Sequence, residues 1–235
     1  MKNESIINYF DRESIEATEF RRLYLNIRNS ANGETKAVAV TSAILEEGKS
    51  TVSSFLALTA AASSNDRILL LDGDLRRPKI HLLFRFPLKP GLVDILRKDC
   101  PVKEAIHLTP ASGLSVITAG ILDDEPTLLL NETRLRELFE ELKFYFDFIV
   151  VDVPPVIPVS DPVVIGSELD GVLVVVRVGR TPREIVKRSV NFLHNSRVKV
   201  LGVVLNNLEE VLPYYYKSKH YGYDYYSRGK SQSKK

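Results

Sequence analysis

A glycine, a lysine and two hydroxyl side chains follow one another at residues 48–51, at the end of the stretch TSAILEEGKST. A lysine amine can bind the outer oxygens of a polyphosphate, and a serine hydroxyl after it can ligate Mg²⁺. Backbone N–H groups at the start of a helix add partial positive charge for the same anion. Gly48, Lys49 and Ser50 supply these parts in order, so they predict a phosphate-binding loop, although Ala43 stands where such a loop usually begins with glycine.

Three aspartates follow apolar runs that are expected to be strands. The stretch ILLLDGDLRRP carries Asp72 and Asp74, and FIVVDVPP carries Asp152. In a parallel sheet the carboxyl ends of all strands lie at one edge, where such folds bind their ligands. Carboxylates beside a polyphosphate repel it unless a cation lies between them. The pattern therefore predicts Mg²⁺ held by Ser50 and some of these aspartates.

The segments that must position these residues are short and apolar throughout, which is typical of strands covered on both faces. Valine and isoleucine, which favour strands, dominate them. The runs are 36–40, 68–72, 148–152, 171–176 and 200–205, with a weaker one at 114–118. They predict a mostly parallel sheet.

Helix-like segments alternate with these runs. They are expected at 50–64, at 127–145 and at 182–195, the last with Pro182 in its first turn. Alternation of this kind predicts a three-layer α/β fold. Ahead of the first strand, residues 15–29 read as an amphipathic helix, which either packs on the sheet or contacts another subunit.

Composition narrows the class of protein. A chain of 235 residues with 44% hydrophobic residues can enclose one large core. A formal net charge of +2 gives no support for a nucleic-acid partner, and a single cysteine, Cys100, excludes an internal disulfide or a multi-cysteine metal site. No apolar stretch approaches the roughly 18 residues of a membrane span. We expect a reducing, cytoplasmic location, with any membrane attachment supplied by another chain.

The stretch PYYYKSKHYGYDYYSR holds seven of the ten tyrosines of the chain. Charged residues, glycine and serine surround them, so the segment is expected to be a disordered extension. Two other readings are an unstructured adhesive end and a basic, aromatic strip that stacks on nucleic-acid bases. The expected organisation is a helical segment at 1–30, a nucleotide-binding core at 31–207 and a flexible tail at 208–235. The tyrosines are Tyr214, Tyr215, Tyr216, Tyr221, Tyr223, Tyr225 and Tyr226.

Taken together, the loop at 43–51, LLLDGDLRRP at 69–78, FIVVDVPP at 148–155 and the tyrosine cluster resemble the bacterial tyrosine kinases (BY-kinases). The resemblance runs from about residue 18 to the end and implies a P-loop core similar to those of the MinD and ParA ATPases. It implies an ATP- and Mg²⁺-dependent kinase that phosphorylates its own C-terminal tyrosines.

The resemblance also assigns roles to residues. Asp72 is the implied base for the tyrosine hydroxyl, which fits a phenol whose pKa of about 10 makes it a poor nucleophile at neutral pH. The implied catalytic residues are Lys49, Asp72, Asp74 and Arg76, and the implied magnesium environment is Ser50, Asp74 and Asp152. The implied nucleotide-binding residues are Glu47, Gly48, Lys49, Ser50, Thr51, Asn206 and Asn207, and the seven tyrosines are the implied phosphoacceptors.

The chain departs from the family pattern in three places, one of which is the usual P-N-P element, altered here to DEPTLLL at 124–130. Leu45 and Glu46 replace the proline and first glycine of P-G-E-G-K-S-T, which is expected to weaken nucleotide binding or to make activity depend on an activator. The family's oligomer motif, E-x-x-R-x-x-R, retains only Arg21 of its three charged positions, so the resemblance implies an oligomer without supporting a ring.

The implied partner is a transmembrane protein of the chain-length-regulator type, which stimulates the kinase at the inner face of the plasma membrane. The implied process is control of capsular or exopolysaccharide synthesis and export, and protein tyrosines are the substrates.

Two further functions remain open from the sequence. A MinD- or ParA-like ATPase switch is disfavoured because Ile44 stands where those proteins carry a signature lysine. A catalytically weak, nucleotide-binding regulator of a membrane polysaccharide co-polymerase is favoured by Glu46. A GTPase is disfavoured because the guanine-reading pattern N-K-x-D is absent.

Overall fold

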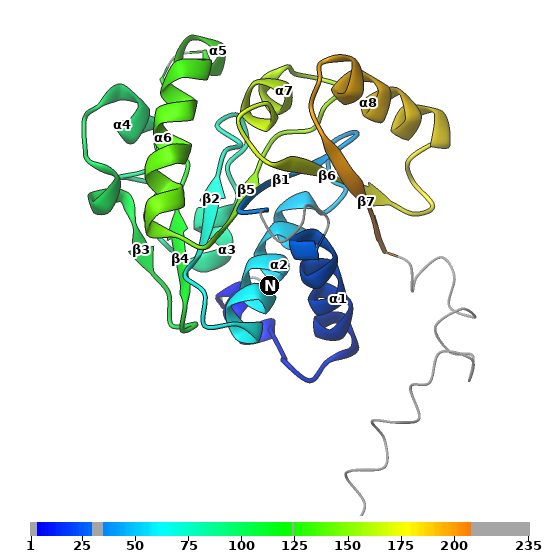
Figure 1. Cartoon of the computed structure of the whole chain (residues 1–235), viewed down its shortest axis with the longest axis horizontal. Helices are drawn as coiled ribbons and strands as arrows, with labels where there is room; N and C mark the ends of the chain where they lie inside the picture. Colours follow the sequence, from blue (N-terminus) through cyan, green and yellow to red (C-terminus); the bar gives the residue numbers. More distant parts are fainter. Residues whose placement is uncertain (1–3, 30–34, 124, 208–235) are drawn as a thin grey trace, which may run out of the picture.

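A computed structural model describes residues 4–29, 35–123 and 125–207 of the chain. Its centre is a seven-stranded sheet in the order β3-β4-β2-β5-β1-β6-β7 (Figure 1). Every neighbouring pair is parallel except β3 with β4. The strands are β1 (Ala37–Ser42), β2 (Ile68–Asp72), β3 (His107–Leu108), β4 (Leu114–Ile117), β5 (Phe148–Asp152), β6 (Gly171–Arg177) and β7 (Val200–Asn206). The mostly parallel sheet is confirmed.

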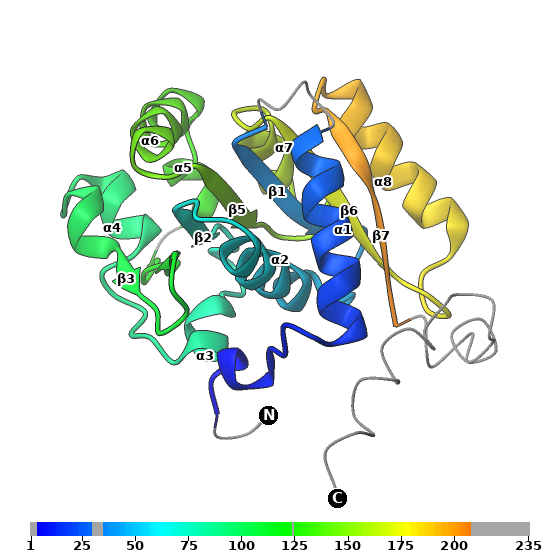
Figure 2. The same cartoon turned by 60° about the horizontal axis from the view of Figure 1, so that its bottom comes forward.

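Helices cover both faces of this sheet, as Figure 2 shows. One face carries η1 (Ile6–Tyr9), α1 (Ile15–Asn29), α2 (Lys49–Ser63) and α3 (Ile80–Phe84). The other carries α4 (Leu92–Arg97), η2 (Val102–Ala105), α5 (Pro126–Leu129), α6 (Glu132–Tyr145), α7 (Asp161–Gly166) and α8 (Arg183–Asn195). The predicted three-layer α/β architecture is confirmed.

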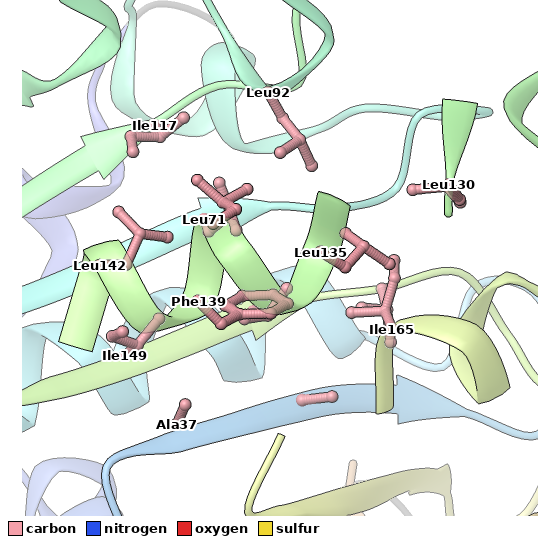
Figure 3. Close-up of a cluster of buried hydrophobic side chains, with 14 of the residues drawn as sticks. Ala37, Leu71, Leu92, Ile117, Leu130, Leu135, Phe139, Leu142, Ile149 and Ile165 are labelled. Carbon is pink, nitrogen blue, oxygen red and sulfur yellow. The ribbon is translucent and has the colours of Figure 1, made fainter. Parts of the chain in front are cut away.

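Two hydrophobic cores lie between the layers because alternate residues of each strand point to opposite faces. In β5, Ile149 belongs to the core under α6, whereas Val150 belongs to the core under α2. Helix α6 buries Leu135, Phe139 and Leu142, which lie one turn apart on one side of the helix (Figure 3). The strands read as continuously apolar because both faces are covered.

The helix expected at 127–145 is two helices in the structure. Asn131 interrupts it, and its side-chain oxygen accepts hydrogen bonds from the backbone N–H of Thr133 and Arg134, at 2.9 and 3.4 Å. This is an N-cap, which starts α6 anew. Pro182 was expected in the first turn of the last helix, but it is the cap residue just before α8.

Helix α1 has the bounds expected from its sequence and packs on the rest of the core. Phe20 stacks on Phe55 of α2, with ring centroids 5.7 Å apart, and Tyr24 meets Phe148 of β5 edge to face at 5.3 Å. The Tyr24 hydroxyl donates to Asp66 at 3.0 Å. The structure thus shows the packing role of this helix. Among the described residues, no helix has the length and apolar character needed to cross a membrane.

Candidate functional site

The predicted phosphate loop connects β1 to α2 at the carboxyl edge of the sheet. Its last residue, Gly48, has a φ of 90°, in the left-handed region that favours glycine. A Cβ at this position would lie 2.2 Å from the side-chain nitrogen of Asn206. That nitrogen donates to the backbone oxygen of Glu47 at 2.8 Å. Glycine is therefore required both by the backbone conformation and by the close approach of β7.

Lys49, the first residue of α2, lies between two of the predicted carboxylates. Its amine is 2.8 Å from Asp74 Oδ2 and 3.5 Å from Asp152 Oδ2. Burial alone would lower the pKa of Lys49, but the charges of Asp152 and Asp74 outweigh it and raise that pKa. The amine is also 3.4 Å from the hydroxyl of Ser50. The structure thus brings Lys49, Ser50, Asp74 and Asp152 together.

Asp152 and Asp72 occupy matching positions on the neighbouring strands β5 and β2. Burial raises the pKa of Asp152, and burial together with the charge of Asp152 raises the pKa of Asp72 to about 8. Asp152 accepts a hydrogen bond from the Ser53 hydroxyl at 3.0 Å. Asp72 accepts three from backbone N–H groups, at Asp74, Lys79 and Ile80. Asp72 is fully buried and holds the turn after β2 in place.

The side chains at this edge of the sheet are better suited to bind Mg²⁺ together with a nucleotide than to bind a metal ion alone. Among the described residues, no three His, Cys, Asp or Glu side chains gather as a metal site. Mg²⁺ in nucleotide sites is bound by one or two protein oxygens together with phosphate oxygens and water. Ser50, Asp74 and Asp152 can supply the protein oxygens, and Lys49 can supply the countercharge for the phosphates. Thr51 follows in the same turn of α2.

Arg76 lies apart from the lysine cluster. Its guanidinium forms two hydrogen bonds with the Asp161 carboxylate, at 2.8 and 3.1 Å. Asp161 is the first residue of α7 and is buried. The sequence placed Arg76 among the catalytic residues, and the structure shows it linking the turn after β2 to the helix that follows β5.

The Glu47 side chain is also directed away from the lysine cluster. It is buried, and it accepts hydrogen bonds from the backbone N–H of Ile44 and Arg177, at 2.8 and 3.2 Å, and from the hydroxyl of Thr181. The Glu47 carboxylate therefore stabilises the conformation of the phosphate loop. Only the backbone of Glu47 is left to contact a nucleotide.

Glu46, which stands where the family loop has a glycine, adopts the left-handed conformation, with a φ of 63°. Its carboxylate pairs with Arg180 at 3.0 Å, and the same guanidinium donates to the Glu46 backbone oxygen at 3.3 Å. Sequence reasoning missed this contact, because the two residues lie 134 positions apart and no motif connects them.

Asn206 is the last residue of β7, beside the phosphate loop, and Asn207 follows it. The Asn206 side chain bonds to Glu47 and accepts from the backbone N–H of Asn207 at 2.9 Å. A groove of about 780 Å³ opens next to them, lined by α1, Val52 and β7. The seven predicted phosphoacceptor tyrosines lie outside the described residues.

The chain is similar to known proteins. A family model described as "ParA: NUBPL iron-transfer P-loop NTPase" matches residues 34–233. The tyrosine-protein kinase YwqD of Bacillus subtilis is 30% identical over 223 residues, which are 94% of this chain and 91% of that protein. The putative tyrosine-protein kinase EpsB of Ralstonia nicotianae is 31% identical over 220 residues, and the match spans only 29% of EpsB.

A solved structure shows the same similarity. The kinase domain of the Escherichia coli tyrosine kinase ETK superposes with a TM-score of 0.81 at 30% sequence identity. The match covers 88% of this chain and 81% of that one.

Proposed function

Because this chain belongs to the bacterial tyrosine kinases, a branch of the ParA-type P-loop NTPases, we propose that it transfers the γ-phosphoryl group of ATP to tyrosines of its own C-terminal segment. The process it regulates is capsular or exopolysaccharide synthesis. The observation that carries the proposal is the position of Lys49, with its amine within 3.5 Å of both Asp74 and Asp152 at the start of α2.

The residues divide the work between binding and charge compensation. Lys49 exchanges its carboxylate partners for phosphate oxygens, and the N–H groups of the first turn of α2 bind the same anion. Ser50, Asp74 and Asp152 would hold Mg²⁺, which would neutralise charge on the phosphates. Asn206 and Asn207, which lie beside the phosphate loop, are the proposed contacts for the base of the nucleotide. Phosphoryl transfer needs little more than alignment and charge compensation of this kind.

Asp72 is the proposed acceptor of the tyrosine proton. A pKa of about 8 keeps it mostly protonated at pH 7, and only the ionised carboxylate can accept a proton. Asp72 is buried behind the turn that follows β2, so a tyrosine reaches it only when that turn moves. Arg76, held by Asp161, sets the position of this turn.

A membrane partner and self-association complete the proposal. The match to YwqD spans 91% of that protein, whereas the match to EpsB spans 29% of a longer one. The same unit thus occurs nearly alone and as part of a larger chain. We infer that this chain works at the cytoplasmic face of the plasma membrane, as an oligomer, with a chain-length-regulator-type protein as its activator.

An ATPase switch would share the phosphate loop and the ParA-type fold. The kinase is favoured because the relatives over most of the chain are named tyrosine-protein kinases and because seven tyrosines cluster in residues 214–226.

The test is incubation with MgATP followed by mass spectrometry, with Lys49→Met as the control. Phosphotyrosine within residues 214–226 that is lost in the variant supports the kinase. ATP turnover with unmodified tyrosines would establish the switch instead.

A further inference from the structure

The phosphate loop is held from one side by the turn that connects β6 to α8, residues 177–181. Glu47 bonds to the backbone N–H of Arg177 and to the hydroxyl of Thr181, and Arg180 bonds to both the carboxylate and the backbone oxygen of Glu46. Four hydrogen bonds thus join the loop to a turn about 130 residues away in the sequence.

The Glu47 contacts and the Glu46 contact differ in character. Glu47 is buried, and its carboxylate binds two elements at once, so its removal would disturb the fold of the loop. Glu46 and Arg180 are exposed, with 74% and 41% of their side chains accessible. The Glu46–Arg180 contact can therefore be removed without opening the core, and its contribution can be measured separately.

Glu46 creates two problems for a loop that binds phosphate. A residue with a Cβ in the left-handed region is strained, and a carboxylate in the loop repels an anion. Arg180 offsets both effects. Its guanidinium neutralises the charge of the Glu46 carboxylate and holds the Glu46 backbone oxygen in place through a hydrogen bond. A glycine at position 46 would carry no charge and would not be strained in this conformation, so Arg180 would not be needed to offset either effect.

We propose that Arg180 is a positioning residue for nucleotide binding, and that it acts through Glu46 by neutralising its charge and holding the left-handed turn of the phosphate loop. The proposal rests on the nucleotide site of the proposed function. It also implies that nucleotide affinity depends on salt, because ions screen an exposed pair.

A double-mutant cycle tests this on the full chain, with MgADP binding measured by titration calorimetry. We expect Arg180→Ala to weaken binding about two- to fivefold, in keeping with the strength of exposed ion pairs. In a Glu46→Gly background, Arg180→Ala should not change MgADP binding, because the carboxylate that Arg180 neutralises is absent. Arg180→Lys should restore part of the loss, and 0.5 M NaCl should shrink the difference between wild type and Arg180→Ala.

The other outcomes are decisive as well. If Arg180→Ala lowers MgADP affinity equally in both backgrounds, Arg180 acts on the nucleotide or the fold directly. If it does not lower the affinity in the wild-type background, the Glu46–Arg180 pair has no role in binding. Either result overturns the inference. Arg183→Ala is the matched control, since it removes a neighbouring exposed charge and should bind MgADP as the wild type does. Failure of the wild-type chain to bind MgADP would instead refute the proposed nucleotide site.

Discussion

Asp72 and Asp152 face each other across β2 and β5 at one register position, both buried. Two carboxylates so placed cannot both ionise at low cost, because burial raises the pKa of both and the charge of Asp152 raises the pKa of Asp72 further. Lys49, whose amine contacts Asp152 and Asp74, supplies the positive charge that makes one ionised carboxylate tolerable. Without nucleotide, the site thus contains a protonated Asp72 and a Lys49 amine paired with carboxylates. A bound nucleotide must replace those contacts of Lys49.

The first prediction concerns stability against pH in the absence of nucleotide and metal. The pKa of Asp72 is about 8 in the folded protein against 3.8 as its ordinary value, so between these values the folded state holds a proton that the unfolded state has released. The free energy of unfolding should then fall as the pH rises from about 4 to about 8, by up to about 1.4 kcal/mol per pH unit. Urea unfolding at pH 5, 7 and 8.5 measures this. Asp72→Asn should flatten the slope, and parallel slopes for the two proteins would contradict the assignment.

Lys49→Met should abolish both tyrosine phosphorylation and MgADP binding. It should also destabilise the protein by about 2–4 kcal/mol at pH 8, because it leaves buried carboxylates without their counter-ion. At pH 5 the penalty should shrink, because burial raises the pKa of Asp152 and a carboxyl group that takes up a proton needs no counter-ion. Thermal unfolding at the two pH values tests this, and Lys49→Arg, which keeps the charge, is the control. A penalty that is independent of pH would indicate lost packing rather than lost charge.

Gly48→Ala should weaken MgADP binding about tenfold or more. The new methyl group would lie 2.2 Å from the Asn206 side chain, and alanine is strained at a φ of 90°. Asn206→Ala in the same chain should recover part of the free energy of unfolding that Gly48→Ala removes, because it relieves the clash but not the strain. Gly202→Ala is the matched control, since no atom lies within 4 Å of its added Cβ. Equal losses at the two glycines would show that neither the left-handed conformation of Gly48 nor the approach of β7 matters.

Arg76→Ala should lower the free energy of unfolding by about 2–3 kcal/mol, because it leaves the buried Asp161 carboxylate without its partner. The turn after β2 would lose its link to α7, so we expect kcat for tyrosine phosphorylation to fall while the KM for ATP changes little. Arg76→Lys should recover stability only in part, since lysine cannot make the paired contact. A raised KM with unchanged kcat would place Arg76 at the nucleotide instead.

The sequence predicts the strands well and the contacts of the loops poorly. The apolar runs that became β2 and β5 have the expected bounds, because burial on both faces leaves an unbroken signal. The aspartates at their ends converge as predicted, since parallel strands share one edge. Single contacts between distant loops leave no such signal in the sequence. Arg76 contacts Asp161, which lies 85 residues later, and no repeating pattern of residue types indicates that contact.

Short elements were missed for a related reason. Helices α3, α4 and α7 have five or six residues each, too few for a helical period to show. The break at Asn131 was hidden because apolar residues continue on both sides of it, so the capping residue was read as part of one helix.

The place of β1 at the interior of the sheet has a consequence for synthesis. It pairs with β5 on one side and β6 on the other, segments that leave the ribosome more than a hundred residues later. A nascent chain that ends before residue 148 contains the lysine and serine of the nucleotide site but neither neighbour of the strand that presents them. We therefore expect nascent chains that end before β5 and β6 not to bind ATP, and the nucleotide site to form only after both strands have been translated.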